Sequence, residues 1–115
     1  MAHPIQATQA ADNTLIARLK GSLTVMTAPD LRVGLLDAIK THNPKVLALN
    51  LAEVDFVDSS ALGVFVEARR KMVAEQGGVT FTNVNADIRG LMRIMNLESV
   101  FNFVEDEADL QTSAD

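Results

Sequence analysis

The chain has 115 residues, the usual size of one domain, which excludes a multidomain enzyme. Its 10 basic and 15 acidic residues give a net charge of −5, which argues against a nucleic-acid binder with a basic surface. Because 48% of the residues are hydrophobic and only 22% are charged, the composition predicts a folded domain rather than a disordered chain.

Residue types that are absent or scarce exclude several kinds of site. The absence of cysteine excludes disulfides, thiolate metal sites and cysteine nucleophiles, and it fits a reducing compartment. The two histidines, His3 and His42, are not part of the three or four clustered ligands that zinc requires. The sequence shows neither the blocks of a signal peptide nor an apolar run of about 18 residues. We expect a cytoplasmic protein without metal or other cofactor, and without direct insertion into a membrane.

The first part of the chain predicts a hairpin followed by a helix. Residues 5–23 predict two strands with a turn at Asp12-Asn13, because apolar and polar side chains alternate after the turn. Thr27 precedes Ala28-Pro29-Asp30, which predicts a helix capped by the threonine hydroxyl, with proline and an acid in its first turn. His42-Asn43-Pro44 should end this helix.

A strand and a second helix follow. The nearly continuous apolar run of residues 46–51 is typical of a strand buried on both faces, at the centre of a sheet. A polar link with Glu53 and Asp55 should separate this strand from the next helix, which runs to about Gln76. Gly77-Gly78 predicts the end of that helix, by supplying a left-handed conformation.

The last part of the chain predicts two further strands around a third helix. Residues 79–84 alternate as a strand, and Asn85 or Asp87 should cap a helix with an apolar stripe that includes Met92. Residues 100–104 predict a short final strand. The order β-β-α-β-α-β-α-β, in which each helix joins two strands, predicts a single α/β domain with a mixed, largely parallel sheet.

The sequence Asp58-Ser59-Ser60 places two hydroxyls where a strand-end loop becomes a helix. One interpretation is ordinary capping, in which Ser59 or Asp58 accepts hydrogen bonds from free amides of the helix start. The other is a functional site, because ligands of open α/β sheets bind at the carboxyl ends of strands and helix starts favour anions. Gly63 costs about 1 kcal/mol relative to alanine within a helix, which indicates a packing reason or a closely approaching partner.

These residues resemble a known family. Residues 58–63, together with Leu49-Asn50-Leu51 and residues 54–57, are similar to the signature of STAS domains, specifically of the bacterial anti-sigma factor antagonists. Residues 21–23 and 27–31 are similar to the family's entry into its first helix, and the resemblance runs from about residue 5 to residue 104. It implies one STAS-type domain at 1–104.

The resemblance also implies a function. In that family a serine-kinase anti-sigma factor phosphorylates a serine at this helix start, and a metal-dependent serine phosphatase reverses the reaction. The unphosphorylated antagonist binds the kinase and releases the sigma factor. Aligned with the family pattern, the phosphorylated residue is Ser60, with Ser59 as second choice, and Ala61 stands where the family often has glycine. The implied partner-binding residues are Asp58, Ser59, Ala61, Leu62 and Gly63.

Other readings of the sequence remain open. Glu53, Asp55 and Asp58 could form a divalent-metal or phosphoryl-aspartate site, but the spacing from Asp55 to Asp58 is one residue too long for an Asp-x-Asp pattern. No Gly-x-Ser-x-Gly nucleophile motif is present, so we expect no enzyme. The main alternative function is a constitutive STAS subunit of a larger assembly, such as a lipid-transport complex, in which phosphorylation plays no part.

Two surface features and the tail complete the predictions. The basic run Arg69-Arg70-Lys71 is either a solvated helix face or a contact for an acidic patch on a partner. Met92, Ile94 and Met95 should fill the core or a groove, and could join a binding surface. Residues 105–115 hold five acids and no lysine or arginine, which predicts an acidic tail, frayed or disordered, on a domain of zero net charge.

Overall fold

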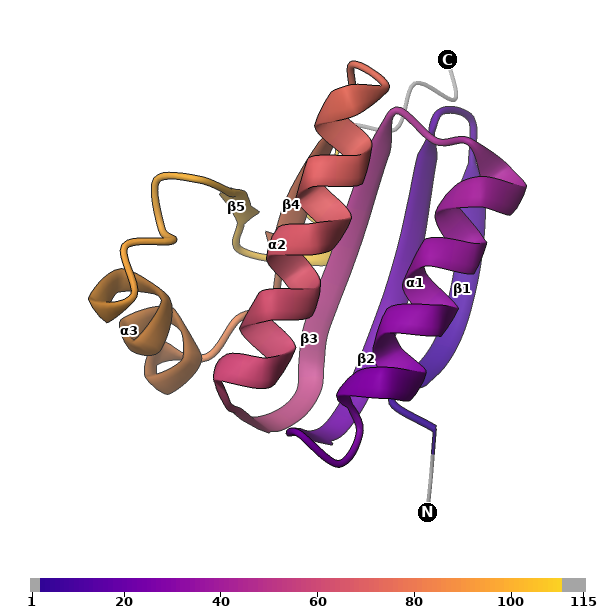
Figure 1. The fold of residues 1–115 in the computed structure, drawn as a ribbon. Helices are drawn as coiled ribbons and strands as arrows, with labels where there is room; N and C mark the ends of the chain where they lie inside the picture. Colours follow the sequence, from indigo (N-terminus) through magenta and orange to yellow (C-terminus); the bar gives the residue numbers. More distant parts are fainter. Residues whose placement is uncertain (1–2, 111–115) are drawn as a thin grey trace.

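The computed structural model describes residues 3–110 (Figure 1). In this range the elements follow the predicted order β-β-α-β-α-β-α-β, with a short 3-10 helix (η1) at the end. Their bounds are β1 Ile5–Ala11, β2 Thr14–Leu23, α1 Ala28–His42, β3 Val46–Val57, α2 Ser59–Ala74, β4 Gly78–Thr82, α3 Ala86–Ile94, β5 Asn102–Val104 and η1 Glu107–Asp109. None of the helices within residues 3–110 is long and apolar enough to cross a membrane.

The strands form one mixed sheet in the order β1-β2-β3-β4-β5. β1 and β2 pair antiparallel as a hairpin, and the other three pairings are parallel. The predicted sheet and the central position of β3 are therefore confirmed. β3 is longer than predicted, because it pairs with β2 as far as Val57, so that Glu53 and Asp55 belong to the strand instead of a polar link.

The hydrophobic core lies between the sheet and the pair of helices α1 and α2, which run side by side over one face of it (Figure 1). Alternate residues of β2 point into this core, and this explains the alternation of side chains from which the strand was predicted. Phe65 of α2 packs edge-on against Phe81 of β4, with ring centroids 5.1 Å apart. The core fixes the two helices over the strand ends that carry the site.

The residues that end the helices differ in part from the predictions. α1 ends at His42, as the sequence indicated, and Asn43 takes the left-handed conformation with φ 46°. At the end of α2 the prediction was wrong, because the left-handed residue is Gln76, with φ 64°. Gly78 is already part of β4, and a side chain at Gly77 would place its Cβ 2.6 Å from the carbonyl oxygen of Lys45. Glycine at position 77 therefore serves a close approach of two backbone segments.

The segment after β5 crosses the face of the sheet opposite α1 and α2. Glu107 accepts hydrogen bonds from Arg18 of β2 at 2.9 and 2.7 Å and from Asn50 of β3 at 2.9 Å. These bonds hold the pKa of Glu107 below its ordinary value, against the effect of partial burial. The first part of the predicted acidic tail is thus joined to the sheet through Glu107, and its last part, 111–115, lies outside the described residues.

Candidate functional site

The candidate site lies where β2 and β3 end. The two strands run parallel, and their last paired residues are Leu23 and Val57. The loop from β2 to α1 and the junction from β3 to α2 are therefore neighbours at the carboxyl edge of the sheet, where open α/β sheets place their sites.

Asp58 connects these two segments. Its Oδ1 accepts hydrogen bonds from the amides of Ser60 at 2.8 Å and Ala61 at 3.3 Å, so that Asp58, and not Ser59, caps α2. Its Oδ2 accepts a hydrogen bond from the amide of Val25 at 3.0 Å, and its own amide donates to the carbonyl of Leu23 at 3.0 Å. One side chain therefore fixes both the start of α2 and the loop before α1.

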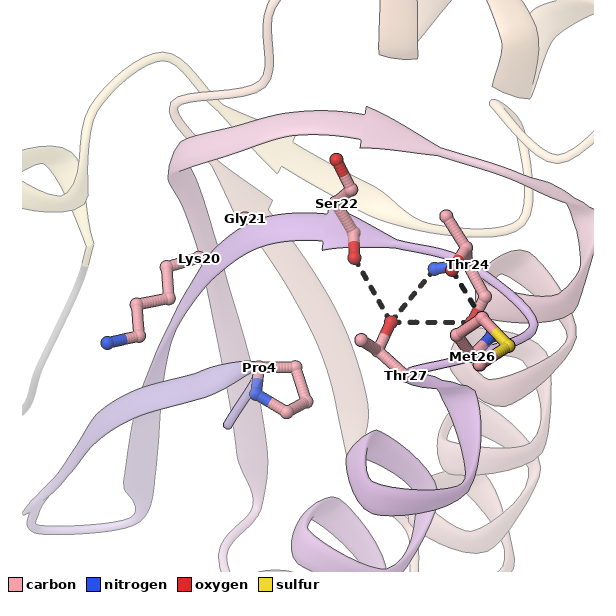
Figure 2. Close-up of a pocket in the computed structure, with 7 residues that line it drawn as sticks. All are labelled: Pro4, Lys20, Gly21, Ser22, Thr24, Met26 and Thr27. Carbon is pink, nitrogen blue, oxygen red and sulfur yellow. Dashed lines mark hydrogen bonds between the residues drawn. The ribbon is translucent and has the colours of Figure 1, made fainter. Parts of the chain in front are cut away.

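The loop before α1 is further fixed by threonines, as Figure 2 shows for the pocket beside it. Thr27 occupies the predicted cap position of α1, but its side chain does not cap the helix. Its hydroxyl instead accepts a hydrogen bond from the amide of Thr24 at 2.9 Å and donates to the carbonyl of Ser22 at 3.1 Å. The Thr27 hydroxyl thus stabilises the loop in the conformation in which the Val25 amide donates to Asp58.

The acidic residues of this region do not assemble into a metal site. Asp55 accepts a hydrogen bond from the hydroxyl of Ser22 at 2.9 Å, while both carboxylate oxygens of Asp58 bind backbone amides. Across residues 3–110, no three side chains of the metal-ligating types come together. The geometry therefore does not support a divalent-metal site formed by Glu53, Asp55 and Asp58.

Ser60 faces α1. It is half-buried and lines a shallow groove together with residues from the start of α1 and the loop before it. The other residues of the groove are Val25, Ala28, Pro29, Arg32, Val33 and Val64. We call this the α1-side groove. Apart from Arg32 its lining is apolar or carries only the serine hydroxyl, so a partner that covers it removes Ser60 from water.

Ser59 lies on a different side of α2. It is exposed and lines a second groove, between α2 and the end of α3. The other residues of this α3-side groove are Leu62, Gly63, Val66, Glu67, Arg70, Met95 and Leu97. The two candidate serines are adjacent in sequence but belong to different surfaces.

The remaining predicted partner-binding residues separate into buried and exposed ones. Ala61 is 0% exposed and Leu62 is 2% exposed, so their side chains pack in the core and hold the start of α2 in place. The methyl group of Ala61 therefore does not project from the surface. Gly63 is exposed, and a Cβ at this position would meet nothing within 4 Å. Packing within the described chain gives no reason for this glycine.

Two exposed apolar residues beside Ser60 were not predicted from the sequence. Val25 and Val33 are 63% and 64% exposed and line the α1-side groove with Ser60, so they form an apolar patch at the start of α1. Met26, which follows Val25 in the loop, is 70% exposed. The signal was present in Val25-Met26, an apolar pair within the loop that precedes a helix start. Ile94 and Met95 are likewise exposed, whereas Met92 is buried, so the methionine cluster divides between core and surface.

The charged residues near the site form defined contacts. Arg32 of α1 binds Glu67 of α2 through two hydrogen bonds, at 2.8 and 2.7 Å. This contact lowers the pKa of Glu67 below its ordinary value and raises that of Arg32, and the charges of Arg70 and Lys71 lower the pKa of Glu67 further. The basic run of α2 also includes Arg69, which has a structural role, because it donates to the carbonyl of Val100 at 2.8 Å.

Comparisons with known proteins agree with this fold. The model of the STAS domain family matches residues 6–110. An anti-sigma F factor antagonist of Paenibacillus polymyxa is 29% identical over 99 residues, which cover 85% of this chain and 84% of the relative.

Two solved structures illustrate the similarity of fold. A putative anti-sigma factor antagonist from Thermotoga maritima matches with a TM-score of 0.81 and 19% identity, over 90% of this chain and 88% of its own. The Bacillus cell fate determinant SpoIIAA in its phosphorylated form matches with a TM-score of 0.67 and 22% identity, over 89% of this chain and 95% of its own. Because the family model covers nearly the whole sequence, the chain belongs to the STAS domain family.

Proposed function

We propose that the protein is an anti-sigma factor antagonist controlled by phosphorylation of Ser60. In its unphosphorylated form it binds a serine-kinase anti-sigma factor and thereby releases a sigma factor; a metal-dependent serine phosphatase restores this form. The proposal is supported by the similarity to a curated anti-sigma F factor antagonist. The observation that carries it is the position of Ser60, half-buried in an apolar groove beside the exposed side chains of Val25 and Val33.

The apolar surroundings of Ser60 explain how a phosphate would act on binding. A phosphoserine carries about −1.5 to −2 charges at neutral pH. When a partner covers the α1-side groove, this charge has to leave water, and only Arg32 within the groove carries a compensating charge. A penalty of several kcal/mol is enough to abolish binding of micromolar affinity, which is worth about 8 kcal/mol.

The fold itself should tolerate the modification. The cap of α2 is the carboxylate of Asp58, so the Ser60 hydroxyl is not needed to begin the helix. A change at this hydroxyl therefore acts mainly on the surface that the partner meets. The charge of the phosphate would therefore weaken partner binding without a large conformational change.

The decisive experiment combines phosphate mapping with binding. The protein is incubated with the cognate kinase and ATP, and mass spectrometry locates the phosphate; we expect it on Ser60 and expect S60A to accept none. S60D should bind the kinase about 100-fold more weakly while its melting temperature stays nearly unchanged.

Matched serine variants decide between the outcomes. Phosphate that persists in S60A and disappears only in S59A would move the switch to Ser59. Loss of cooperative folding in S60D would show that Ser60 is chiefly structural. Binding of a partner to wild type and S60D with equal affinity would favour a constitutive assembly subunit instead of a switch.

A further inference from the structure

The contact between Arg32 and Glu67 joins α1 to α2 next to the α1-side groove. Both hydrogen bonds of the guanidinium go to the two carboxylate oxygens of Glu67, in a bidentate arrangement. The ion pair is accessible to solvent, and Arg32 is exposed. A pair of this kind is held weakly and can exchange partners at little cost.

Arg32 also lies between Ser60 and Glu67. It lines the groove that contains Ser60 as well as a second groove that contains Glu67, Arg70 and Lys71. On α2, Ser60 and Glu67 are seven residues apart, so they lie on the same face of the helix, about two turns or roughly 10 Å from each other. The guanidinium at the end of a long, flexible side chain therefore has two candidate acceptors on one helix face.

A phosphate on Ser60 would find little stabilisation at the start of α2 itself. The amides of Ser60 and Ala61 already donate to Asp58, and the amide of Leu62 donates to the carbonyl of Asp58. The Asp58 carboxylate adds a negative charge next to the phosphate, which is unfavourable. Among the residues that line the α1-side groove, Arg32 alone is positively charged.

We infer that Arg32 moves its guanidinium from Glu67 to the phosphate when Ser60 is phosphorylated. The planar guanidinium binds phosphate in the same bidentate way as it binds a carboxylate. Glu67 is not left without positive neighbours, because Arg70 and Lys71 also act on it. The exchange rests on the proposed phosphorylation of Ser60, and it makes Arg32 the residue that distinguishes the two forms.

Phosphorus NMR can test this exchange without any kinase. Phosphoserine is incorporated at position 60 during synthesis, and the pH titration of its phosphorus signal gives the second pKa of the phosphate, ordinarily about 6. We expect this pKa to be lower in the otherwise wild-type protein than in R32Q by about 0.5. R70Q is the matched control, because Arg70 also neighbours Glu67 but lines the α3-side groove, and it should change the phosphate pKa by less than half as much as R32Q does.

A double-mutant cycle tests the competition with Glu67. E67Q removes the present acceptor of Arg32, so the phosphate pKa should fall further, and this fall should shrink when R32Q is present. Equal phosphate pKa values in wild type and R32Q would overturn the inference, as would strictly additive effects of R32Q and E67Q. Because the phosphate is installed without a kinase, a failure here leaves the proposed partner switch intact, and failure of kinase phosphorylation leaves this result intact.

Discussion

The two sides of the first turn of α2 share one cap, the Asp58 carboxylate, but differ in burial and in charge. Ser60 is half-buried against α1, whereas Ser59 is exposed toward α3, because successive helix residues point about 100° apart. The α1-side groove holds a single charged residue, Arg32, while the α3-side groove holds Glu67 and Arg70.

The contrast shows why a one-residue shift of the phosphate matters. A phosphate on the α1 side enters a largely apolar surface, where removal from water is costly. A phosphate on the α3 side lies in a charged and more polar surface, where a partner could accommodate it more easily. If the proposed phosphorylation occurs, the same modification should therefore weaken partner binding more at Ser60 than at Ser59.

Among variants that leave both serines unchanged, the largest expected effect comes from placing a charge in each groove separately. V33D should weaken binding of the cognate kinase about 30-fold, or about 2 kcal/mol, because Val33 lies in the patch that we propose as the partner surface. M95D on the α3 side should weaken it less than threefold. Both residues are exposed, so the free energy of unfolding should change by less than about 0.5 kcal/mol. Equal losses of affinity, measured by calorimetry, would mean that the partner covers both sides.

The next largest effect should follow from removing the shared cap. D58A deletes the acceptor of the Ser60, Ala61 and Val25 amides and should lower the free energy of unfolding by about 1–2 kcal/mol. Urea unfolding measures the loss. D55A is the matched control, because within residues 3–110 Asp55 accepts only from the exposed Ser22 hydroxyl, and it should lose less than half as much. Similar losses in both variants would contradict the central role of Asp58.

A smaller effect is expected far from both grooves, where Glu107 binds the sheet. E107Q should lower the free energy of unfolding by about 1 kcal/mol at pH 7, because Arg18 loses a charged acceptor. The pKa of Glu107 is lowered in the folded protein, so its contribution is complete above the unfolded pKa near 4.5 and disappears as the pH falls through the folded value.

The same variant separates stability from binding. E107Q should bind the kinase like the wild type, since Glu107 lies on the opposite face of the sheet. A stability difference between wild type and E107Q that stays constant from pH 7 to pH 3 would show that the ionised carboxylate is not responsible.

The smallest effect concerns Gly63, on the α3 side. G63A should stabilise the free protein by about 0.5 kcal/mol, because alanine is the better helix former and the added methyl meets nothing within 4 Å. If the partner approaches this backbone closely, the same methyl should weaken binding. Thermal unfolding and calorimetry on one variant therefore show whether contact extends from the α1 side to the α3 side.

Local sequence patterns predicted most of the fold. The alternation in β2, the apolar run of β3 and the sequence Asn43-Pro44 depend on neighbouring residues, and the structure confirms the elements they indicated. The start of α2 was also readable, because an aspartate before an apolar helix is ordinary capping chemistry. The full length of β3 could not be predicted, because Glu53 and Asp55 interrupt its hydrophobic pattern while its backbone still pairs with β2.

The parts of the site that depend on distant residues could not be predicted. Arg32 and Glu67 are 35 positions apart, and Arg18 and Glu107 are 89 apart, so no local spacing connects them. The assignment of each serine to a groove depends on where α1 and α3 pack beside α2. The end of α2 was predicted wrongly because glycine at position 77 is required by the close approach of the Lys45 carbonyl, which belongs to another segment.

The strand order has a consequence for how the protein is made. In the order β1-β2-β3-β4-β5 every strand pairs with the strand synthesised just before it, so the sheet can grow at one edge as the chain leaves the ribosome. The loop at Val25, Asp58 and Ser60 can come together once α2 has emerged, while α3 and β5 are still inside the ribosome. A nascent chain would then carry a finished α1-side groove before the α3 side of its α3-side groove has emerged.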